Sequence, residues 1–176
     1  VNSVAFSLDA GRVLTGSDDK TAKLWNAVTG AVVRTFSGHT GSVRSVAYSP
    51  GVTTVLTGSS DGTAKLWNAT TGAVMRTLRG HTSAVTSVAY SADGRRVLTG
   101  SEDKTARSWD AQTGAAVRTF PGHTESVLSA AFSPDGTKVL TGSADDTAKL
   151  WDAANGLEIR TFSGHTDDVN SVAFSP

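Results

Sequence analysis

The sequence predicts an all-β protein made of four successive antiparallel sheets, and three observations lead to this prediction. Every histidine of the chain, from His39 to His165, lies 42 residues from the next, and the four tryptophans, from Trp25 to Trp151, follow the same period. Each 42-residue row contains four short β-rich runs separated by turn sequences. These runs carry small or apolar residues on both sides, which is typical of sheets covered on both faces. A fixed period of this length indicates structural repeats that stack.

The period divides the chain into four rows and a remainder. The rows are residues 1–42, 43–84, 85–126 and 127–168, followed by a stub at 169–176. The stub repeats the beginning of the chain, because VNSVAFS occupies residues 1–7 and again residues 169–175. We therefore expect four structural units and the first strand of a fifth. Since the chain starts without a methionine and within a repeat, we also expect it to be a piece of a longer protein.

The second row shows how each unit is built. Its first β-rich run, residues 43–49, ends at PGVT, and the other rows have LDAG, ADGR or PDGT at this point, which are tight-turn sequences. Further strands are expected at 55–59, 64–67 and 73–78, with turns at 60–63 and 68–72 and a loop at 79–84. Four strands at about ten-residue spacing predict an antiparallel sheet without helices. One row cannot bury both of its faces alone, so neighbouring rows must stack.

Composition argues against several classes of function. Sixteen basic and sixteen acidic side chains cancel, so neither nucleic acid nor a membrane surface is expected as a partner. No apolar run is long enough to span a membrane, and no secretory leader is visible. Cysteine is absent, which agrees with a reducing compartment, and we expect a cytoplasmic protein. No cofactor is expected, because no phosphate-binding, calcium or zinc motif is present.

The rows closely resemble the WD-repeat family over essentially the whole chain. The matching features are the GH pair, runs similar to SVAFSPDG such as SAAFSPDG at 129–136, the pattern LTGSxD, and TAKLW followed by Asp or Asn. The resemblance implies a β-propeller whose blades are four-stranded sheets, and four rows correspond to about half of a six-to-eight-bladed ring. Rows one and two end the signature with Asn26 and Asn68, and rows three and four end it with Asp110 and Asp152. Ser108 departs from the Leu found at the same position of the other rows, and this puts a polar group in the third strand of row three.

The family implies that each histidine belongs to a structural hydrogen-bond network. In it, the Thr of LTGS contacts the histidine, and the Trp of the third strand and the Asp of the second turn complete the set. A buried imidazole and a buried indole each need a hydrogen-bond partner, so the physical logic agrees. The complete sets are His39, Thr57, Asp61 and Trp67; His81, Thr99, Asp103 and Trp109; and His123, Thr141, Asp145 and Trp151. Thr15, Asp19 and Trp25 have no preceding histidine, and His165 has no following Thr, Asp and Trp.

Catalysis and metal binding are not expected. Histidine, aspartate and a hydroxyl group together suggest a hydrolase triad, but an enzyme does not need the same triad every 42 residues. The histidines also lack a carboxylate or cysteine at metal-ligand spacing. We therefore predict no catalytic and no metal-binding residue.

Binding is expected at one end of the blades. Successive turns of a four-stranded sheet fall at opposite ends, so the GH loops and the second turns share one end, and in the family this end commonly receives protein partners. The positions that vary among the rows here are the candidates: Asp18, Arg44, Ser60, Thr86, Glu102, Glu125, Leu128, Asp167, Asp168 and Asn170. The invariant arginines of the fourth strands, such as Arg34, are interpreted as protection of the exposed sheet edge.

These observations predict a non-enzymatic protein-protein interaction scaffold, part of a WD-repeat propeller, with a protein or peptide as partner. The alternative is a sensor or regulatory segment of a larger bacterial signalling NTPase or kinase. The complementary ends further predict a head-to-tail homodimer that closes an eight-bladed ring. Residues 1–7 and 169–175 would then compete for one inner-strand position, and we expect residues 169–175 to occupy it.

Overall fold

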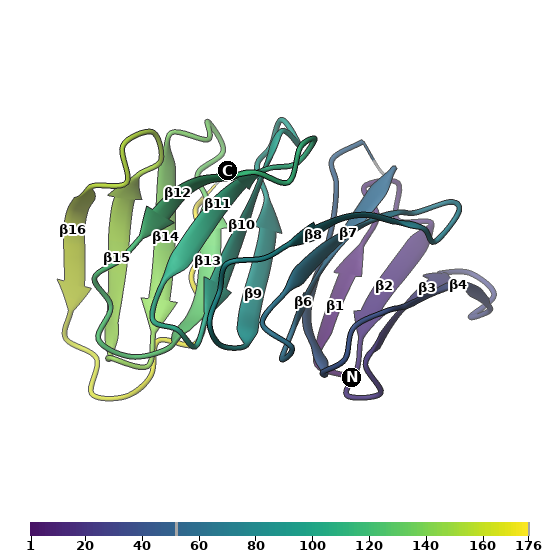
Figure 1. Cartoon of the computed structure of the whole chain (residues 1–176), viewed down its shortest axis with the longest axis horizontal. Coiled ribbons are helices and arrows are strands. Elements are labelled where there is room, and N and C mark those ends of the chain that lie inside the picture. Colours follow the sequence, from purple (N-terminus) through teal and green to yellow (C-terminus); the bar gives the residue numbers. More distant parts are fainter. Residues whose placement is uncertain (52, 176) are drawn as a thin grey trace.

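The computed structural model describes residues 1–51 and 53–175, and within them it is all-β, as the sequence predicts. Sixteen strands form four separate four-stranded sheets, which lie side by side in chain order (Figure 1). We call these sheets blades 1 to 4. Their strands are β1 (Ser3–Phe6), β2 (Arg12–Gly16), β3 (Thr21–Asn26) and β4 (Val32–Ser37); β5 (Val43–Tyr48), β6 (Thr54–Ser59), β7 (Ala64–Asn68) and β8 (Val74–Leu78); β9 (Val85–Tyr90), β10 (Arg96–Ser101), β11 (Ala106–Asp110) and β12 (Ala116–Phe120); and β13 (Val127–Phe132), β14 (Lys138–Ser143), β15 (Thr147–Asp152) and β16 (Glu158–Ser163).

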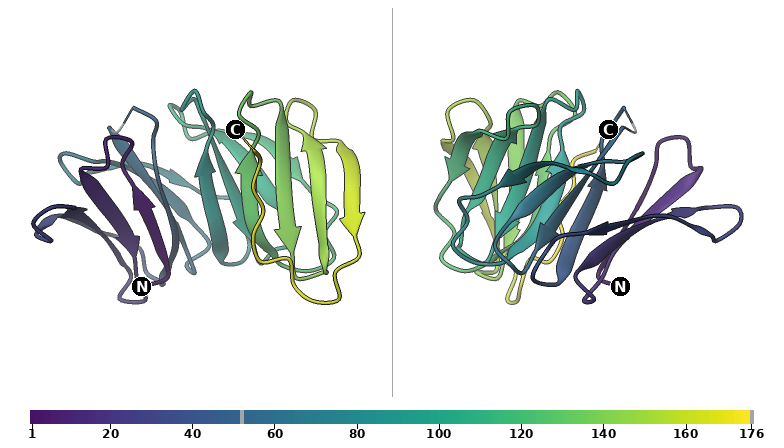
Figure 2. Two further views of the ribbon diagram at one scale, coloured as in Figure 1. Left: turned by 180° about the vertical axis from the view of Figure 1, so that it is seen from behind. Right: turned by 45° about the vertical axis from the view of Figure 1, so that its right-hand side comes forward.

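Within each blade, every strand pairs antiparallel with the next along the chain. The first strands of successive blades, β1, β5, β9 and β13, contact one another and form the inner side of the array. The blades fan out from this side, and the ring is not closed (Figure 2). The fold therefore has an open face on blade 1 and another on blade 4.

The turns follow the chemistry expected from the sequence. In the first turn of blade 3, the Ser91 hydroxyl donates to the Asp93 carboxylate at 2.6 Å, and that carboxylate accepts the Arg95 N–H. Gly94 has a φ of +69°, a left-handed conformation that glycine adopts without steric cost. In the second turn of blade 2, the Asp61 carboxylate accepts the backbone N–H and the hydroxyl of Thr63. These local hydrogen bonds fix the ends of the strands.

The core consists of three similar clusters, one at each junction between neighbouring blades. At the first junction, Leu14 and Phe36 of blade 1 pack with Val55 and Trp67 of blade 2, and all four are at most 1% exposed. The same columns of the repeat build the other two clusters. Glycine permits the blades to come close, because a Cβ on Gly58 would lie 2.7 Å from a methyl group of Val88. Blades 2 and 3 are thus covered on both faces by their neighbours, as the apolar runs of the sequence indicate, whereas blades 1 and 4 are each covered on one face.

Arginines of the outermost strands add a second set of contacts between blades. Arg34 donates to the Thr70 carbonyl at 2.6 Å, Arg76 to the Gln112 carbonyl at 2.9 Å, and Arg118 to the Ala154 carbonyl at 2.6 Å. Each bond joins the fourth strand of one blade to the third turn of the next. These arginines therefore hold neighbouring blades together, a role that goes beyond edge protection.

Residues 169–175 do not form a strand, but they lie along the open side of blade 4 and lead from the GH-loop end of the blades to the opposite end (Figure 2). Val169 donates its N–H to the Ser143 carbonyl at 3.0 Å, and Val172 donates its N–H to the Ser129 hydroxyl at 3.2 Å. Residues 3–6, which carry the same sequence as 171–174, form β1 and pair with β2 in blade 1. In the single chain, the first copy of VNSVAFS thus belongs to blade 1, and the second copy lies beside blade 4.

Ser108 gives a first prediction about stability. It is fully buried in β11, and its hydroxyl has no hydrogen-bond partner among the described residues. Leu24 and Leu66 occupy the same position in blades 1 and 2 and are buried in the junction clusters. We expect Ser108→Leu to raise the free energy of unfolding by about 1–3 kcal/mol, because it buries apolar area and removes an unpaired hydroxyl. Urea titration measures the change.

The reverse substitution, Leu66→Ser, provides the matched control. It places the same unpaired hydroxyl at the corresponding position of blade 2, so it should destabilise the chain. A Ser108→Leu variant no more stable than the original would mean that blade 3 has no room for the leucine.

Candidate functional site

The histidine of the first GH loop lies at the centre of a hydrogen-bond network that spans blade 2. His39 Nδ1 is 2.8 Å from Asp61 Oδ2, and its Nε2 is 2.7 Å from the Thr57 hydroxyl. Trp67 Nε1 donates to the same hydroxyl at 2.8 Å. The Asp61 carboxylate also accepts the backbone N–H of Thr40, which ties the loop to the second turn.

Blades 3 and 4 repeat this geometry. The Nδ1 to carboxylate distance is 2.7 Å for both His81–Asp103 and His123–Asp145, and the Nε2 to hydroxyl distance is 2.7 Å for both His81–Thr99 and His123–Thr141. The indole N–H groups of Trp109 and Trp151 donate to the same hydroxyls at 2.9 Å. The structure therefore brings all three complete sets together.

Burial controls the charge state of the network. It lowers the pKa of His39, and the hydrogen bond and charge of Asp61 only partly oppose this effect. Burial raises the pKa of Asp61, but hydrogen bonds from Thr63, the Thr40 N–H and His39 outweigh it and hold the pKa at about 2. A neutral histidine that donates from Nδ1 must accept at Nε2, so the Thr57 hydroxyl donates to it. Each polar group of the set has its partner.

The incomplete sets lie at the two ends of the array. Trp25 Nε1 donates to the Thr15 hydroxyl at 2.9 Å, but no histidine approaches this pair in the structure described. Asp19 accepts the N–H and the hydroxyl of Thr21 in its own turn. His165 is exposed, and its ring forms no hydrogen bond within residues 1–51 and 53–175. Each end thus holds part of one set.

Five of the predicted binding residues line a hollow at the GH-loop end, next to the inner strands. The hollow measures about 370 Å³. Asn2 and Ser42 contribute as well, and Asn2 donates to the Asp18 carboxylate at 2.9 Å. Most of the lining comes from one column of the repeat, which holds the second residues of β5, β9 and β13 together with Asn2 and Asn170. The five predicted residues are Asp18, Arg44, Thr86, Leu128 and Asn170.

Arg44, Ser60 and Glu102 meet at a second hollow of about 400 Å³ between blades 2 and 3. Arg44 donates to the Ser60 hydroxyl at 2.6 Å and to Glu102 Oε1 at 3.0 Å. The ion pair joins the inner strand of blade 2 to the second turn of blade 3. Arg44 is consequently held in place, and it lines both hollows.

The remaining predicted binding residues lie apart from these hollows. Glu125 faces Lys104, whose Nζ is 3.4 Å from Glu125 Oε1. Carboxylates of Asp167 and Asp168 lie with that of Asp146 within 4.8 Å of one another. Asp146 lies in the second turn of blade 4, and Asp167 and Asp168 lie in the loop that follows β16.

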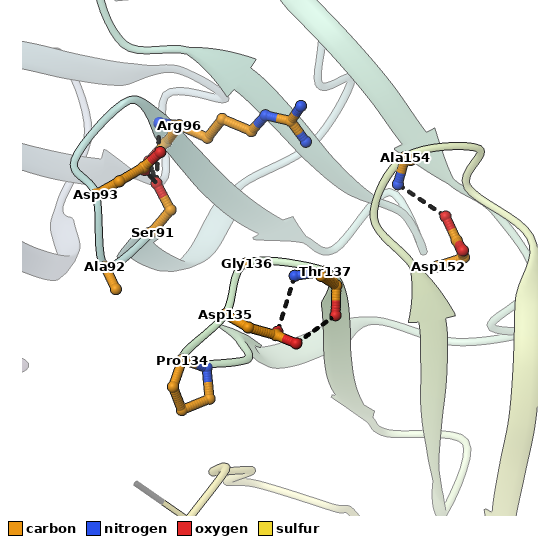
Figure 3. A pocket seen from close by; sticks show the side chains of 10 residues that line it. All are labelled: Ser91, Ala92, Asp93, Arg96, Pro134, Asp135, Gly136, Thr137, Asp152 and Ala154. Atoms are coloured by element: carbon orange, nitrogen blue, oxygen red, sulfur yellow. Dashed lines mark hydrogen bonds between the residues drawn. The ribbon is translucent and has the colours of Figure 1, made fainter.

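The opposite end of the blades carries a larger cleft that sequence reasoning missed. It measures about 500 Å³, lies between blades 3 and 4, and is lined by Asp93, Arg96, Asp135, Thr137 and Asp152 (Figure 3). The carboxylates accept hydrogen bonds within their own turns, for example from the Thr137 N–H and hydroxyl to Asp135. The only signal in the sequence is the coincidence of two acidic turns in adjacent repeats, and their relative placement depends on the packing of the blades.

Comparison with known proteins identifies the repeat. A family model described as "WD domain, G-beta repeat" matches residues 1–26, 30–68, 72–110, 114–152 and 156–176. WD repeat domain-containing protein 83 of Rattus norvegicus is 49% identical over 39 residues, which are 22% of this chain and 12% of that protein, and the Homo sapiens protein gives the same values. F-box/WD repeat-containing protein 7 of Drosophila melanogaster is 47% identical over 38 residues, 22% of this chain and 3% of that protein.

These matches therefore span well under two thirds of the curated relatives. Within the described residues, the structure contains no helix that is long and apolar enough to cross a membrane.

Proposed function

The chain belongs to the WD-repeat family, and from this we propose that it is a non-catalytic scaffold that binds a protein or peptide at the GH-loop end of its blades. WD repeats generally mediate interactions between proteins. The proposal assigns binding to the hollow lined by Asp18, Arg44, Thr86, Leu128 and Asn170.

The single observation that carries the proposal is the composition of this hollow. Five of its lining residues come from one column of the repeat, which contains Asn2, Arg44, Thr86, Leu128 and Asn170. The core and network columns repeat the same residue in nearly every blade, whereas this column has a different side chain in each of blades 2 to 4. A repeated scaffold that presents a non-repeated surface at its inner side is suited to recognise one partner.

The histidine networks support a structural role. The side chains of His39, His81 and His123 are at most 2% exposed, so they are inaccessible to a substrate. In each set, the hydroxyl that would act as nucleophile already accepts the indole N–H of a tryptophan. These groups hold the GH loops in place and therefore shape the binding end.

The cellular setting is part of the proposal. Equal numbers of acidic and basic side chains favour a protein partner over nucleic acid or a membrane surface, and the absence of cysteine favours the cytoplasm. The match to WD repeats favours the scaffold over the alternative, a sensor segment of a larger NTPase or kinase.

Affinity capture with matched variants tests the binding end. Leu128→Arg changes the hollow, and Leu157→Arg makes the same change at an exposed leucine of the opposite end. We expect the original chain and the Leu157→Arg variant to retain the same proteins from the source cells. The amount of these proteins retained by the Leu128→Arg variant should be at least tenfold lower. Equal retention by all three chains would contradict binding at the GH-loop end.

We further propose that a second copy of this chain is one of the partners. The open face of blade 4 presents Phe162, which is 48% exposed, whereas Phe36 and Phe120 at the same position are at most 1% exposed under the tryptophan of the next blade. The open face of blade 1 presents Trp25, which corresponds to those covering tryptophans. Each open face thus has the residues that cover the other.

Polar groups of the two faces are complementary as well. His165 corresponds to the histidines of the complete sets, and Thr15 and Asp19 correspond to their partners. Arg160 corresponds to Arg34, and the third turn of blade 1 corresponds to the turn that Arg34 contacts. Apart from the residues adjacent to Gly30, no atom of residues 1–51 and 53–175 lies within 4 Å of the Cβ position of Gly30 in that turn, whereas Arg34 fills this position at Gly72. Two copies joined head to tail would repeat the internal junction twice and give eight blades.

Light scattering tests this association. We expect a mass about twice that of the 18.1 kDa chain, and a monomer for Phe162→Asp, because the substitution places a charge in the joint. Met75→Asp is the matched control, since Met75 is 44% exposed on β8 of blade 2, away from both open faces. A stable monomer of the original chain at high concentration would contradict the association.

A further inference from the structure

The second copy of VNSVAFS, residues 169–175, makes contacts with blade 4 that an inner strand makes with the preceding blade. Val169 and Val172 donate to Ser143 and Ser129 of blade 4 at 3.0 and 3.2 Å. At the first internal junction, Val43 donates to the Ser17 carbonyl at 2.9 Å and Val46 to the Ser3 hydroxyl at 3.1 Å. Gly142 is also covered by Val169 and Val172, as Gly16 is by Val43 and Val46. Residues 169–175 therefore stand where the inner strand of a following blade would stand.

In a head-to-tail pair, the blade that follows blade 4 is blade 1 of the second copy. The inner-strand position of that blade is already held by its own β1, which pairs with β2. At the first internal junction, the inner strand β5 pairs with β6 of its own blade and also contacts the preceding blade. In the pair of chains, the inner strand at the joint must likewise contact blade 4 of one copy and pair with β2 of the other, so there is room for one strand. The two segments have the same sequence, and only one of them fits.

We propose that residues 169–175 of one copy replace residues 1–7 of the other and pair with its β2; this inference rests on the self-association proposed above. The register follows from that of β1: Phe174 takes the place of Phe6 opposite Val13, and Ser171 takes the place of Ser3 opposite Gly16. The exchange is reciprocal, so each joint of the pair contains one exchanged strand.

Chain connectivity decides which segment stays. With residues 169–175 in the joint, the loop at 164–168 is held at both ends, as the loop at 38–42 is held between β4 and β5. His165 is then restrained close to Thr15 and Asp19 of the second copy. If residues 1–7 stayed, residues 169–175 would lose their place on blade 4 and the loop would be free at one end, which costs conformational entropy when His165 binds. Displacement of residues 1–7 removes the pairing of β1 with β2, which the incoming strand restores.

The side chains of β1 agree with its release. Val4 and Phe6 are each 65% exposed in the single chain, whereas Val46 at the position of Val4 is 6% exposed. β1 therefore depends mainly on its pairing with β2 and its contact with β5. The incoming strand has the same residues and reproduces both of these contacts.

Disulfide trapping tests the exchange, because the chain contains no cysteine. Val13→Cys combined with Phe174→Cys should give a covalent dimer on mild oxidation, seen on a non-reducing gel and located by peptide mass spectrometry. Val13→Cys combined with Phe6→Cys is the matched variant and should remain unlinked in the dimer. Trapping of the second variant within single chains, with no link in the first, would overturn the exchange.

Light scattering of the unoxidised variants separates this inference from the self-association on which it rests. A dimeric mass together with a disulfide between positions 6 and 13 rejects the strand exchange alone. A monomeric mass rejects both the exchange and the self-association. Truncation gives a second readout that does not depend on the new cysteines. Removal of residues 1–7 should change the dissociation constant less than threefold, whereas removal of residues 169–175 should raise it at least tenfold; the opposite order would overturn the proposal.

Discussion

Trp67→Ala is expected to lower the free energy of unfolding by about 3–5 kcal/mol, the range for removal of a large aromatic side chain from a packed core. Trp67 is 1% exposed, and its ring centroid lies 5.7 Å from that of Phe36 in blade 1 and 6.0 Å from that of His39. Its indole N–H also donates to the Thr57 hydroxyl. The substitution therefore opens a cavity at the junction of two blades and breaks one bond of the network. Denaturant titration with tryptophan-independent detection, such as circular dichroism, measures the loss.

Trp25→Ala is the matched control for this effect. Trp25 has the same hydrogen bond to a threonine, but it lies on the open face of blade 1 and is only partly buried. Measured in dilute solution, where single chains are present, Trp25→Ala should cost less than half as much as Trp67→Ala. Equal losses would show that the junction between blades is not the source of the stabilisation.

Acidification is expected to destabilise the fold in two steps. Burial lowers the pKa of His39, His81 and His123 below the ordinary value of 6.5. The unfolded chain therefore binds protons on these residues at a pH where the folded chain does not, and stability falls as the pH decreases below about 6.5. Each additional proton bound by the unfolded chain lowers the free energy of unfolding by about 1.4 kcal/mol per pH unit. Three histidines give at most about 4 kcal/mol per pH unit.

The aspartates of the network produce the second step. Hydrogen bonds hold the pKa of Asp61 and Asp145 at about 2, against an ordinary value of 3.8. Because these pKa values are lower in the folded chain, their stabilising contribution is present above about pH 4 and is lost as the pH falls towards 2. Unfolding free energies measured between pH 8 and pH 2 should show both steps. His39→Gln should reduce the slope of the first step by about a third, and an unchanged slope would contradict the assignment.

The fold and the network could be predicted from the sequence because both depend on residues that recur in every row. The spacing of His39, Asp61 and Trp67 recurs with the 42-residue period, so the sequence contains the complete pattern three times. The strand bounds agree with the predicted runs to within a few residues. Local hydrogen-bond chemistry and the period together were sufficient.

Contacts between repeats could not be predicted in the same way. The bonds from Arg34 and Arg118 to the next blade depend on how two sheets are placed relative to each other, and the period carries no information on that placement. The Arg44–Glu102 pair and the cleft that contains Asp135 also join side chains from different rows. Varying columns identified Arg44 and Glu102 as candidates for binding, but only the packed blades show that they bind each other.

The main contacts of each blade are with the blades next to it in the chain, and this has a consequence for how such a gene can change. Every repeat encodes both halves of the junction, so a duplication or deletion of one whole repeat leaves every remaining junction with matched sides. The number of repeats can therefore vary without compensating substitutions. A substitution of a single residue in a junction column must fit only the one neighbouring repeat that it contacts. If unequal recombination copies the substituted repeat to another place in the array, the residue meets a different neighbour there and has to fit that one as well.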